Sequence, residues 1–222
     1  AELIIAEIVT LARQLGDRSS EVHRGAWKKV AAGCYEVRNK TLGIVGYGHI
    51  GRQLGVLAEA LGMRVLYFDI APRLPMGNNR SVPSLNAVLE QSDFISLHVP
   101  ETSETKNMIG QAQLARMKKG SYLLNASRGT VVVIPDLAAA LKSGHLAGAA
   151  IDVYPEEPES NTDSFRTDLQ GLSNVIPWAG VFMGALQCMR DDWAGLRRWE
   201  LLRVDSRQRL EIPYLPCVRA ER

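Results

Sequence analysis

At 222 residues, the chain is long enough for one large domain or for one domain with attachments, and its formal net charge is only +2. Hydrophobic residues make up 46% and charged residues 23% of the sequence, the composition of an ordinary globular protein. The net charge does not decide for or against nucleic acid, but no basic stripe with interleaved aromatic residues is present. No apolar run is long enough for a membrane span. We therefore expect neither a nucleic-acid partner nor a membrane partner.

The three cysteines, Cys34, Cys188 and Cys217, are widely spaced in the sequence. They form no CxxC pair or other metal-ligand pattern, and their odd number argues against a disulfide framework. We expect a reducing, cytoplasmic setting, no signal peptide and no bound metal. The chain opens in a helical pattern without an initiator methionine, which indicates a truncated or mature start.

The first 40 residues are expected to form a helical segment at a domain or subunit contact. Ala1–Leu15 carries apolar residues at three- and four-residue spacing, and Gly16 can close this helix. A second, more polar helix is predicted over Ser19–Ala32, followed by a connector from Gly33 to Lys40. Trp27 either anchors a partner subunit or covers an edge of the core.

The next stretch contains a glycine motif between two apolar runs. Leu42–Val45 leads into Gly46-x-Gly48-x-x-Gly51, a helical pattern follows, and Asp69 stands at the end of a second apolar run. This order of strand, glycine turn, helix, strand and acid is typical of dinucleotide binding. Gly46 allows the tight turn, Gly48 lets the backbone approach a pyrophosphate, and Gly51 lets the helix pack close to the sheet. Asp69 would accept hydrogen bonds from a ribose diol and repel a 2′-phosphate, which favours NAD over NADP.

Strand and helix patterns alternate from Thr41 to Ile176. The expected strands are Thr41–Val45, Arg64–Asp69, Phe94–Val99, Ser121–Asn125, Leu146–Val153 and a beginning at Asn174–Ile176. The expected helices are His49–Leu61 with Gly62 as its C-cap, Ser84–Gln91 with Ser84 as its N-cap, Gly110–Met117, and one from Pro135 to Ser143. Ala71–Val82 and Pro155–Ser173 are expected to be loops, and Thr130–Val133 is a short apolar stretch. This alternation predicts an α/β fold with a Rossmann-type doubly wound parallel sheet over residues 41–176.

Ligands of such sheets bind beyond the carboxyl ends of the strands, so the polar residues at those ends are candidate site residues. They are Asp69, His98, Asn125 with Ser127 and Arg128, and Asp152. Arg128 could hold an α-hydroxy or α-keto carboxylate with its planar fork, or it could cap a helix or neutralise an acid. His98 could contact the cofactor or only bond to a neighbouring loop. Glu156 and Glu157 could orient a histidine base, or could be solvated loop residues.

These residues together resemble the D-isomer-specific 2-hydroxyacid dehydrogenases, and within that family the enzymes that oxidise phosphoglycerate. The likeness spans residues 1–176, and the His49-Ile50 pair and the run from Ala147 to Asp152 match the phosphoglycerate enzymes in particular. The segments that carry it are Ala1-Glu2-Leu3, His23-Arg24-Gly25-x-Trp27, Leu42 to Gly51, Ser96 to Pro100, Thr105 to Met108, Asn125 to Val131 and His145 to Val153.

The resemblance implies NAD as cofactor and assigns roles to single residues. His49 and Ile50 would line the pyrophosphate turn, and Asp69 would hold the adenosine ribose. Residues along the nicotinamide side would be Ala126, Ser127, Arg128 and Asp152, and His98, Val99 and Pro100 would also contact the cofactor. Arg128 would bind the substrate carboxylate and Glu157 would pair with the catalytic histidine. Trp27 would lie at the contact of a homo-oligomer, Lys29 would help to bind substrate phosphate, and the substrate would be a small 2-hydroxy acid.

The chain departs from the family pattern in two places. We expect only a remnant of the substrate-binding domain, because the half-domain that precedes Ala1 in the family is not in this sequence. After Ile176 the family continues with Thr-Pro-His-x-Gly-Gly, which contains the acid/base histidine, whereas this chain reads Pro177-Trp178-Ala179-Gly180. Residues 177–222 hold three of the four tryptophans and no lysine, which indicates a frameshifted, disordered or truly divergent tail.

Two functional hypotheses follow. The first is an NAD-dependent oxidoreductase that interconverts a phosphorylated 2-hydroxy acid and its 2-keto acid, impaired in this chain. The second is a catalytically inactive NAD-binding module that senses the nucleotide or binds a partner, as the corepressor relatives of the family do.

Overall fold

A computed structural model describes residues 1–158, 160 and 164–177 of the chain. All of the expected tail except Pro177 lies outside the described residues, so the interpretation of that tail stays a prediction.

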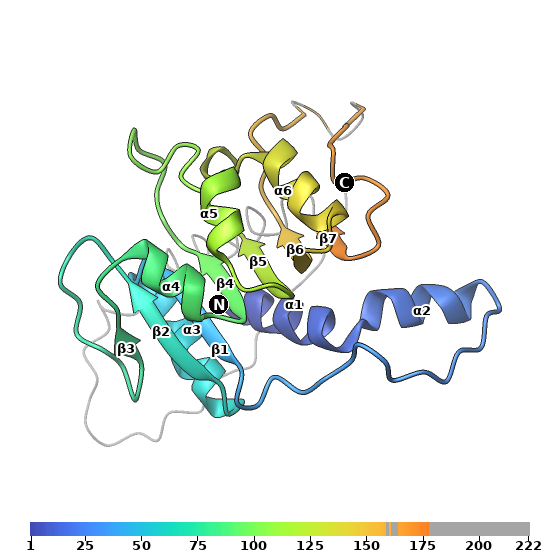
Figure 1. The fold of residues 1–222 in the computed structure, drawn as a ribbon, viewed down its shortest axis with the longest axis horizontal. Helices are drawn as coiled ribbons and strands as arrows, with labels where there is room; N and C mark the ends of the chain where they lie inside the picture. Colours follow the sequence, from blue (N-terminus) through green and yellow to red (C-terminus); the bar gives the residue numbers. More distant parts are fainter. Residues whose placement is uncertain (159, 161–163, 178–222) are drawn as a thin grey trace, which may run out of the picture. The chain divides into compact units, whose positions relative to one another are not determined.

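A single parallel sheet of seven strands organises the described residues (Figure 1). Its order is β3-β2-β1-β4-β5-β6-β7, and every strand pair is parallel. The strands are β1 (Thr41–Val45), β2 (Arg64–Phe68), β3 (Arg80–Ser81), β4 (Phe94–Leu97), β5 (Ser121–Asn125), β6 (Leu146–Ile151) and β7 (Val175–Pro177). The Rossmann-type doubly wound sheet predicted from the sequence is therefore confirmed.

Helices cover both faces of this sheet, and one further helix, α2 (Leu15–His23), extends beyond it (Figure 1). The other helices are α1 (Glu2–Arg13), α3 (His49–Ala60), α4 (Leu85–Gln91), α5 (Gln111–Arg116), α6 (Ile134–Lys142) and the short 3₁₀ helix η1 (Gly129–Val131). One buried cluster joins α4, α5 and α6 to the sheet, and a second joins α1 and α3 to the other face. Neighbouring residues of one strand contribute to different clusters: Ile95 of β4 belongs to the first and Phe94 to the second. Such two-sided burial explains why the strands are almost continuously apolar.

The first predicted helix is shorter than expected, and the second overlaps the observed helix only over Ser19–His23. Helix α1 ends at Arg13, and Gln14 caps it in a left-handed conformation with φ of 53°, so Gly16 is not the cap. Helix α2 then runs over Leu15–His23 rather than Ser19–Ala32, and none of its residues is buried. Gly25 has φ of 77° and ends the helical path. The prediction failed because the residues between Gly25 and Ala32 have no sheet surface here against which to pack, and helix propensity alone does not stabilise so short a helix.

Most of the remaining boundaries agree within two residues. Ser84 caps α4, since its Oγ accepts a hydrogen bond from the Ala87 N–H at 3.2 Å, and Gly62 follows α3 with φ of 76°. The two-residue strand β3 lies inside the expected loop Ala71–Val82. It was not predicted, because so short a polar strand has no periodic pattern. The expected strands ending at Asp69, Val99 and Val153 end one or two residues earlier, where the backbone turns out of the sheet. None of the helices in the described ranges is long and apolar enough to cross a membrane.

Candidate functional site

The strand order reverses at β1, which lies between β2 and β4. In open parallel sheets a crevice forms at such a point, outside the carboxyl ends of the strands. The backbone joins the three strand ends directly: the Gly46 N–H donates to the Phe68 carbonyl at 2.9 Å, and the His98 N–H donates to the Val45 carbonyl at 2.7 Å. The residues that follow β2, β1 and β4 therefore lie side by side, as the sequence predicted.

Two glycines of the motif are required by the fold itself. Gly46 has φ of 92°, and a Cβ there would collide with the backbone carbonyl of His98. A Cβ on Gly51 would collide with the carbonyl oxygen of Gly46. These close approaches hold the first turn of α3 against the end of β1, so that its unpaired N–H groups point into the crevice.

Gly48 is different, because nothing in the fold excludes a side chain from it. It is the N-cap of α3 with φ of −78°, which any residue can adopt, and no atom lies within 4 Å of the position that a Cβ would take. The open space adjoins the positive end of the α3 dipole. The chain therefore keeps a bare backbone where a pyrophosphate would approach, which is the arrangement that a dinucleotide needs.

Asp69 stands directly after β2 and holds the glycine turn in place. Its Oδ2 accepts the Tyr47 N–H at 2.8 Å and its Oδ1 accepts the Ala71 N–H at 2.9 Å. The Arg73 Nε lies 3.4 Å from the same Oδ2, and the Asp69 side chain is only 9% exposed. Each carboxylate oxygen has two lone pairs, so Asp69 can bind the turn and still accept a ribose hydroxyl.

His98 follows β4 and has a fixed partner. Its Nε2 lies 2.8 Å from the Oγ of Ser96, a residue that the sequence did not single out. Burial, and to a smaller extent the α-amino group of Ala1, lowers the pKa of His98 to about 3. His98 is therefore neutral near pH 7 and offers a hydrogen bond rather than a charge.

The ends of β5 and β6 bring a second group of candidates together. Asn125 stabilises the turn after β5 through two side-chain hydrogen bonds. Its Oδ1 accepts the Ser127 Oγ–H at 2.8 Å, and its Nδ2 donates to the Arg128 carbonyl at 3.0 Å. The Asp152 N–H donates to the Asn125 carbonyl at 3.0 Å, and Asp152 is 1% exposed. Asn125 was expected near the site, and its part in shaping the turn is visible only in the fold.

Arg128 and Glu157 lie on loops that touch. The Arg128 side chain is exposed, and its Nη1 donates to the Ser127 carbonyl at 2.7 Å. Glu157 is also exposed, and its Oε1 accepts the Tyr154 N–H at 3.2 Å. A Cβ on Gly129 would collide with the Tyr154 carbonyl group, so a glycine is needed for the two loops to approach this closely.

Glu7 of α1 is a buried acid close to the candidate residue Asp152, and the sequence did not single it out. It is 2% exposed, and neither carboxylate oxygen has a hydrogen-bond partner among the described residues. Burial, and next the charge of Asp152, raise the pKa of Glu7 from 4.5 to about 8, against the smaller opposite effect of the Ala1 amino group. The available signal was its spacing, since Glu7 falls on the apolar stripe of Ile4, Ile8 and Leu11.

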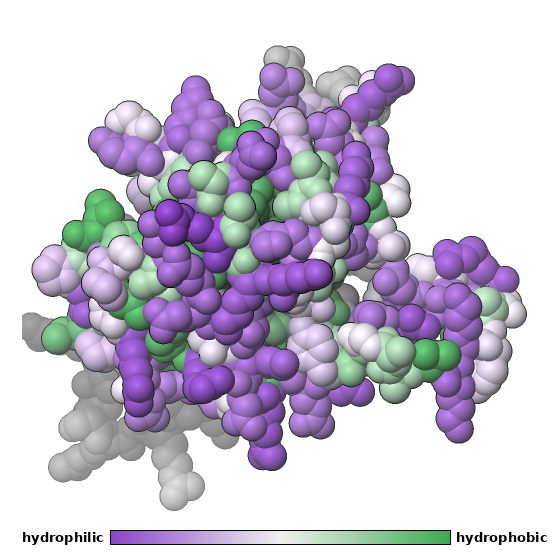
Figure 2. Space-filling view, viewed as in Figure 1, coloured by the Kyte–Doolittle hydropathy of each residue, from purple (hydrophilic) through white to green (hydrophobic). Residues whose placement is uncertain are grey.

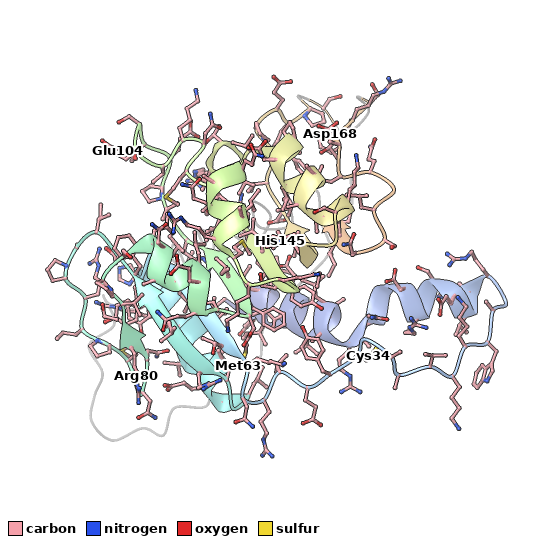
Figure 3. The ribbon with its side chains drawn as sticks, in the orientation of Figure 1. Cys34, Met63, Arg80, Glu104, His145 and Asp168 are labelled. Carbon is pink, nitrogen blue, oxygen red and sulfur yellow. The ribbon has the colours of Figure 1, made fainter. Side chains whose placement is uncertain are left out.

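Two histidines, Trp27, Lys29 and one large cavity lie away from this crevice. His145, which is labelled in Figure 3, precedes β6 at the amino ends of the strands, opposite the candidate residues. Its Nε2 lies 3.0 Å from the Leu114 carbonyl oxygen. His23, Trp27 and Lys29 lie in the exposed segment at and beyond the end of α2. A cavity of about 820 Å³ lies at the amino ends of β1 and β2, lined by Arg64, Glu59 and other residues of both charges, and contains none of the candidates.

Comparisons with known proteins cover most of the chain. The family model of the D-isomer specific 2-hydroxyacid dehydrogenase NAD binding domain matches residues 5–177. D-3-phosphoglycerate dehydrogenase of Dictyostelium discoideum is 62% identical over 176 residues, which cover 79% of this chain and 43% of that protein. The chain thus spans less than half the length of this relative.

Solved structures with the same fold include two that hold a nicotinamide cofactor. D-lactate dehydrogenase with NAD+ from Lactobacillus jensenii has a TM-score of 0.73 at 28% identity, over 81% of this chain and 57% of that one. An acyclic imino acid reductase in complex with NADPH and D-Arg has a TM-score of 0.71 at 25% identity, over 81% of this chain and 56% of that one.

Proposed function

Because the chain belongs to the D-isomer specific 2-hydroxyacid dehydrogenase family, we propose that residues 41–176 form the NAD-binding domain of an NAD-dependent oxidoreductase. The observation that carries this proposal is the pairing of an open Gly48 at the start of α3 with Asp69 at the end of β2, next to the strand reversal. This pairing provides a contact for the pyrophosphate and another for the adenosine ribose.

The remaining cofactor contacts follow the crevice along the strand ends. The glycine turn, with His49 and Ile50 in the first turn of α3, receives the pyrophosphate. The nicotinamide half lies beyond β4, β5 and β6, where the proposed contacts are His98, Val99, Pro100, Ala126, Ser127, Arg128 and Asp152. When bound, NAD accepts a hydride from the substrate carbon. The neutral His98 and the Asn125-tied turn supply fixed hydrogen-bonding groups around it.

Arg128 and Glu157 are the proposed catalytic residues of this chain. An exposed guanidinium at the mouth of the crevice can bind a substrate carboxylate through two parallel hydrogen bonds and polarise the neighbouring carbonyl. Glu157 lies on the adjoining loop and would orient an acid/base group and raise its pKa.

The proposed substrate is a small 2-hydroxy acid, 3-phosphoglycerate, which is oxidised to 3-phosphohydroxypyruvate in serine biosynthesis. Support for the substrate comes from the 62% identical relative, which is named a D-3-phosphoglycerate dehydrogenase. We further propose a cytoplasmic homo-oligomer in which Trp27, 83% exposed here, contacts a second copy. Lys29, on the same exposed segment, would help to bind the substrate phosphate.

The alternative, an NAD-binding module without turnover, is favoured by one observation. None of the four histidines of the sequence is placed to act as an acid/base at this site. His98 is buried with a pKa of about 3, too low for it to take up a proton near pH 7. His145 precedes β6 at the opposite end of the strands, His23 ends the exposed helix α2, and His49 begins α3 beside the glycine turn. A missing general acid/base costs a factor of roughly 10² to 10⁴ in rate.

Titration of the purified full chain with NADH, followed by nicotinamide fluorescence, tests the proposal, together with an assay of phosphohydroxypyruvate reduction at 340 nm. Saturable NADH binding is the expected result. The Asp69→Ala variant should bind NADH at least about tenfold more weakly, because hydrogen bonds to a charged group contribute roughly 1.5–3 kcal/mol each. Asp168→Ala, which removes an exposed carboxylate outside the crevice, is the matched control and should bind as the original chain does.

The outcomes separate the two functions. Binding with turnover supports the enzyme, and binding without turnover supports the module. A chain that is folded by circular dichroism yet does not bind NADH would overturn both.

A further inference from the structure

The loop that follows Asp69 is held in a defined position by two buried tyrosines. Tyr47 of the glycine turn and Tyr67 of β2 stack with ring centroids 3.7 Å apart and an interplanar angle of 12°, and both are almost fully buried. The Tyr67 hydroxyl donates to the Arg73 carbonyl at 2.7 Å, and the Tyr47 hydroxyl accepts the Met76 N–H at 3.1 Å. The loop is thus bonded to β2 at Arg73 and to the glycine turn at Met76.

This anchoring places a cation beside the ribose-binding acid. The Arg73 Nε lies 3.4 Å from the Asp69 Oδ2, and the Arg73 side chain is 40% exposed. A guanidinium has five N–H donors, and this contact is made through Nε alone, so donors remain for a second anion. Around Asp69 the loop also exposes the apolar residues Ile70 and Leu74, and Figure 2 shows apolar side chains at the left edge, where Figure 1 places this loop.

The position of Arg73 bears on which dinucleotide the site accepts. NADPH differs from NADH by a 2′-phosphate that carries a charge near −2 at pH 7. Asp69 alone would repel that group, which is the reason that an acid at this place is associated with NAD. An arginine beside the ribose supplies the opposite charge and can bind phosphate oxygens. A reductase of the same fold has been solved with NADPH, so the fold itself accepts either cofactor.

We propose that Arg73, held by the Tyr47–Tyr67 stack, is a second determinant of cofactor choice and makes the site tolerant of a 2′-phosphate despite Asp69. The inference rests on the proposed dinucleotide site. It adds the expectation that NADPH binds measurably, where an unopposed aspartate would exclude it.

The test compares dissociation constants for NADH and NADPH in the full chain and its variants, by fluorescence titration at low ionic strength. In Arg73→Ala the ratio of Kd for NADPH to Kd for NADH should rise roughly ten- to thirtyfold, because two unit charges about 4 Å apart in water interact by roughly 1 kcal/mol and the phosphate carries nearly two. Arg73→Lys, which keeps the charge, should restore most of the original ratio. Tyr67→Phe, which removes only the hydroxyl that holds the Arg73 carbonyl, should raise the ratio by a smaller factor.

Arg80→Ala is the matched control, since Arg80 is an exposed cation on the neighbouring strand β3 (Figure 3) and should leave the ratio unchanged. An unchanged or lower ratio in Arg73→Ala, with NADH binding intact, would overturn the inference and leave the proposed function standing. Equal shifts in Arg73→Ala and Arg80→Ala would also overturn it, because they would show a general effect of charge. Failure of the original chain to bind NADH would instead overturn the proposed function, and with it this inference.

Discussion

Replacement of Glu7 by glutamine should stabilise the protein at and above neutral pH. The carboxyl group is buried without a hydrogen-bond partner among the described residues and faces the charge of Asp152. An isosteric amide keeps the volume and removes the charge that must otherwise develop in this environment.

The sign of the pH dependence follows from the pKa of Glu7, which is about 8 in the folded chain against 4.5 ordinarily. Between these values the folded state holds a proton that the unfolded state has released, so stability is greatest below pH 4.5 and is lost as the pH rises through 8. A difference of one pKa unit between the folded and unfolded states corresponds to about 1.36 kcal/mol. The free energy of unfolding should therefore fall by at most roughly 5 kcal/mol over this pH range. Glu7→Gln should remove this loss, while its stability at pH 5 stays near that of the original chain.

Urea unfolding followed by circular dichroism at pH 5 to 9 measures the effect. Glu2→Gln, an exposed glutamate on the same helix, is the control and should keep the original pH dependence. Parallel stability curves for the original chain and Glu7→Gln over this range would refute the reasoning, since they would show that Glu7 is charged and solvated in the folded state.

Three further substitutions separate binding from folding. Gly48→Ala should change the stability by less than about 0.5 kcal/mol, because its Cβ meets no atom, yet weaken NADH binding about tenfold or more; unaltered NADH affinity would remove Gly48 from the pyrophosphate contact. Gly51→Ala should lower both the stability and the NADH affinity, because its Cβ would collide with the Gly46 carbonyl. The stability should fall by roughly 1–3 kcal/mol, which a thermal melt measures, and the NADH titration measures the affinity. Ser84→Ala should cost about 1 kcal/mol through the lost N-cap of α4 and leave NADH affinity as it was; an equal melting temperature would show that the cap bond contributes nothing.

Much of the crevice could be predicted from the sequence because its parts are local patterns. The glycine motif, the apolar runs on either side of it and Asp69 lie within 28 residues and each has a strong steric or periodic signal. Parallel strands end at a common edge, so the residues after β2, β4, β5 and β6 could be assigned to one site without knowledge of their contacts. The predicted helix over Ser19–Ala32 was wrong beyond His23, because helix propensity without a packing surface is a weak signal.

By itself, then, the sequence determined the fold class, the dinucleotide motif and the edge of the sheet at which the site lies. Only the tertiary structure decided which groups meet there. Glu7 faces Asp152 across 145 positions of the chain, and the Tyr47–Tyr67 stack sets Arg73 beside Asp69. Contacts of this kind depend on strand order and on which helix covers which face, which are set by burial over the whole domain rather than by any local pattern.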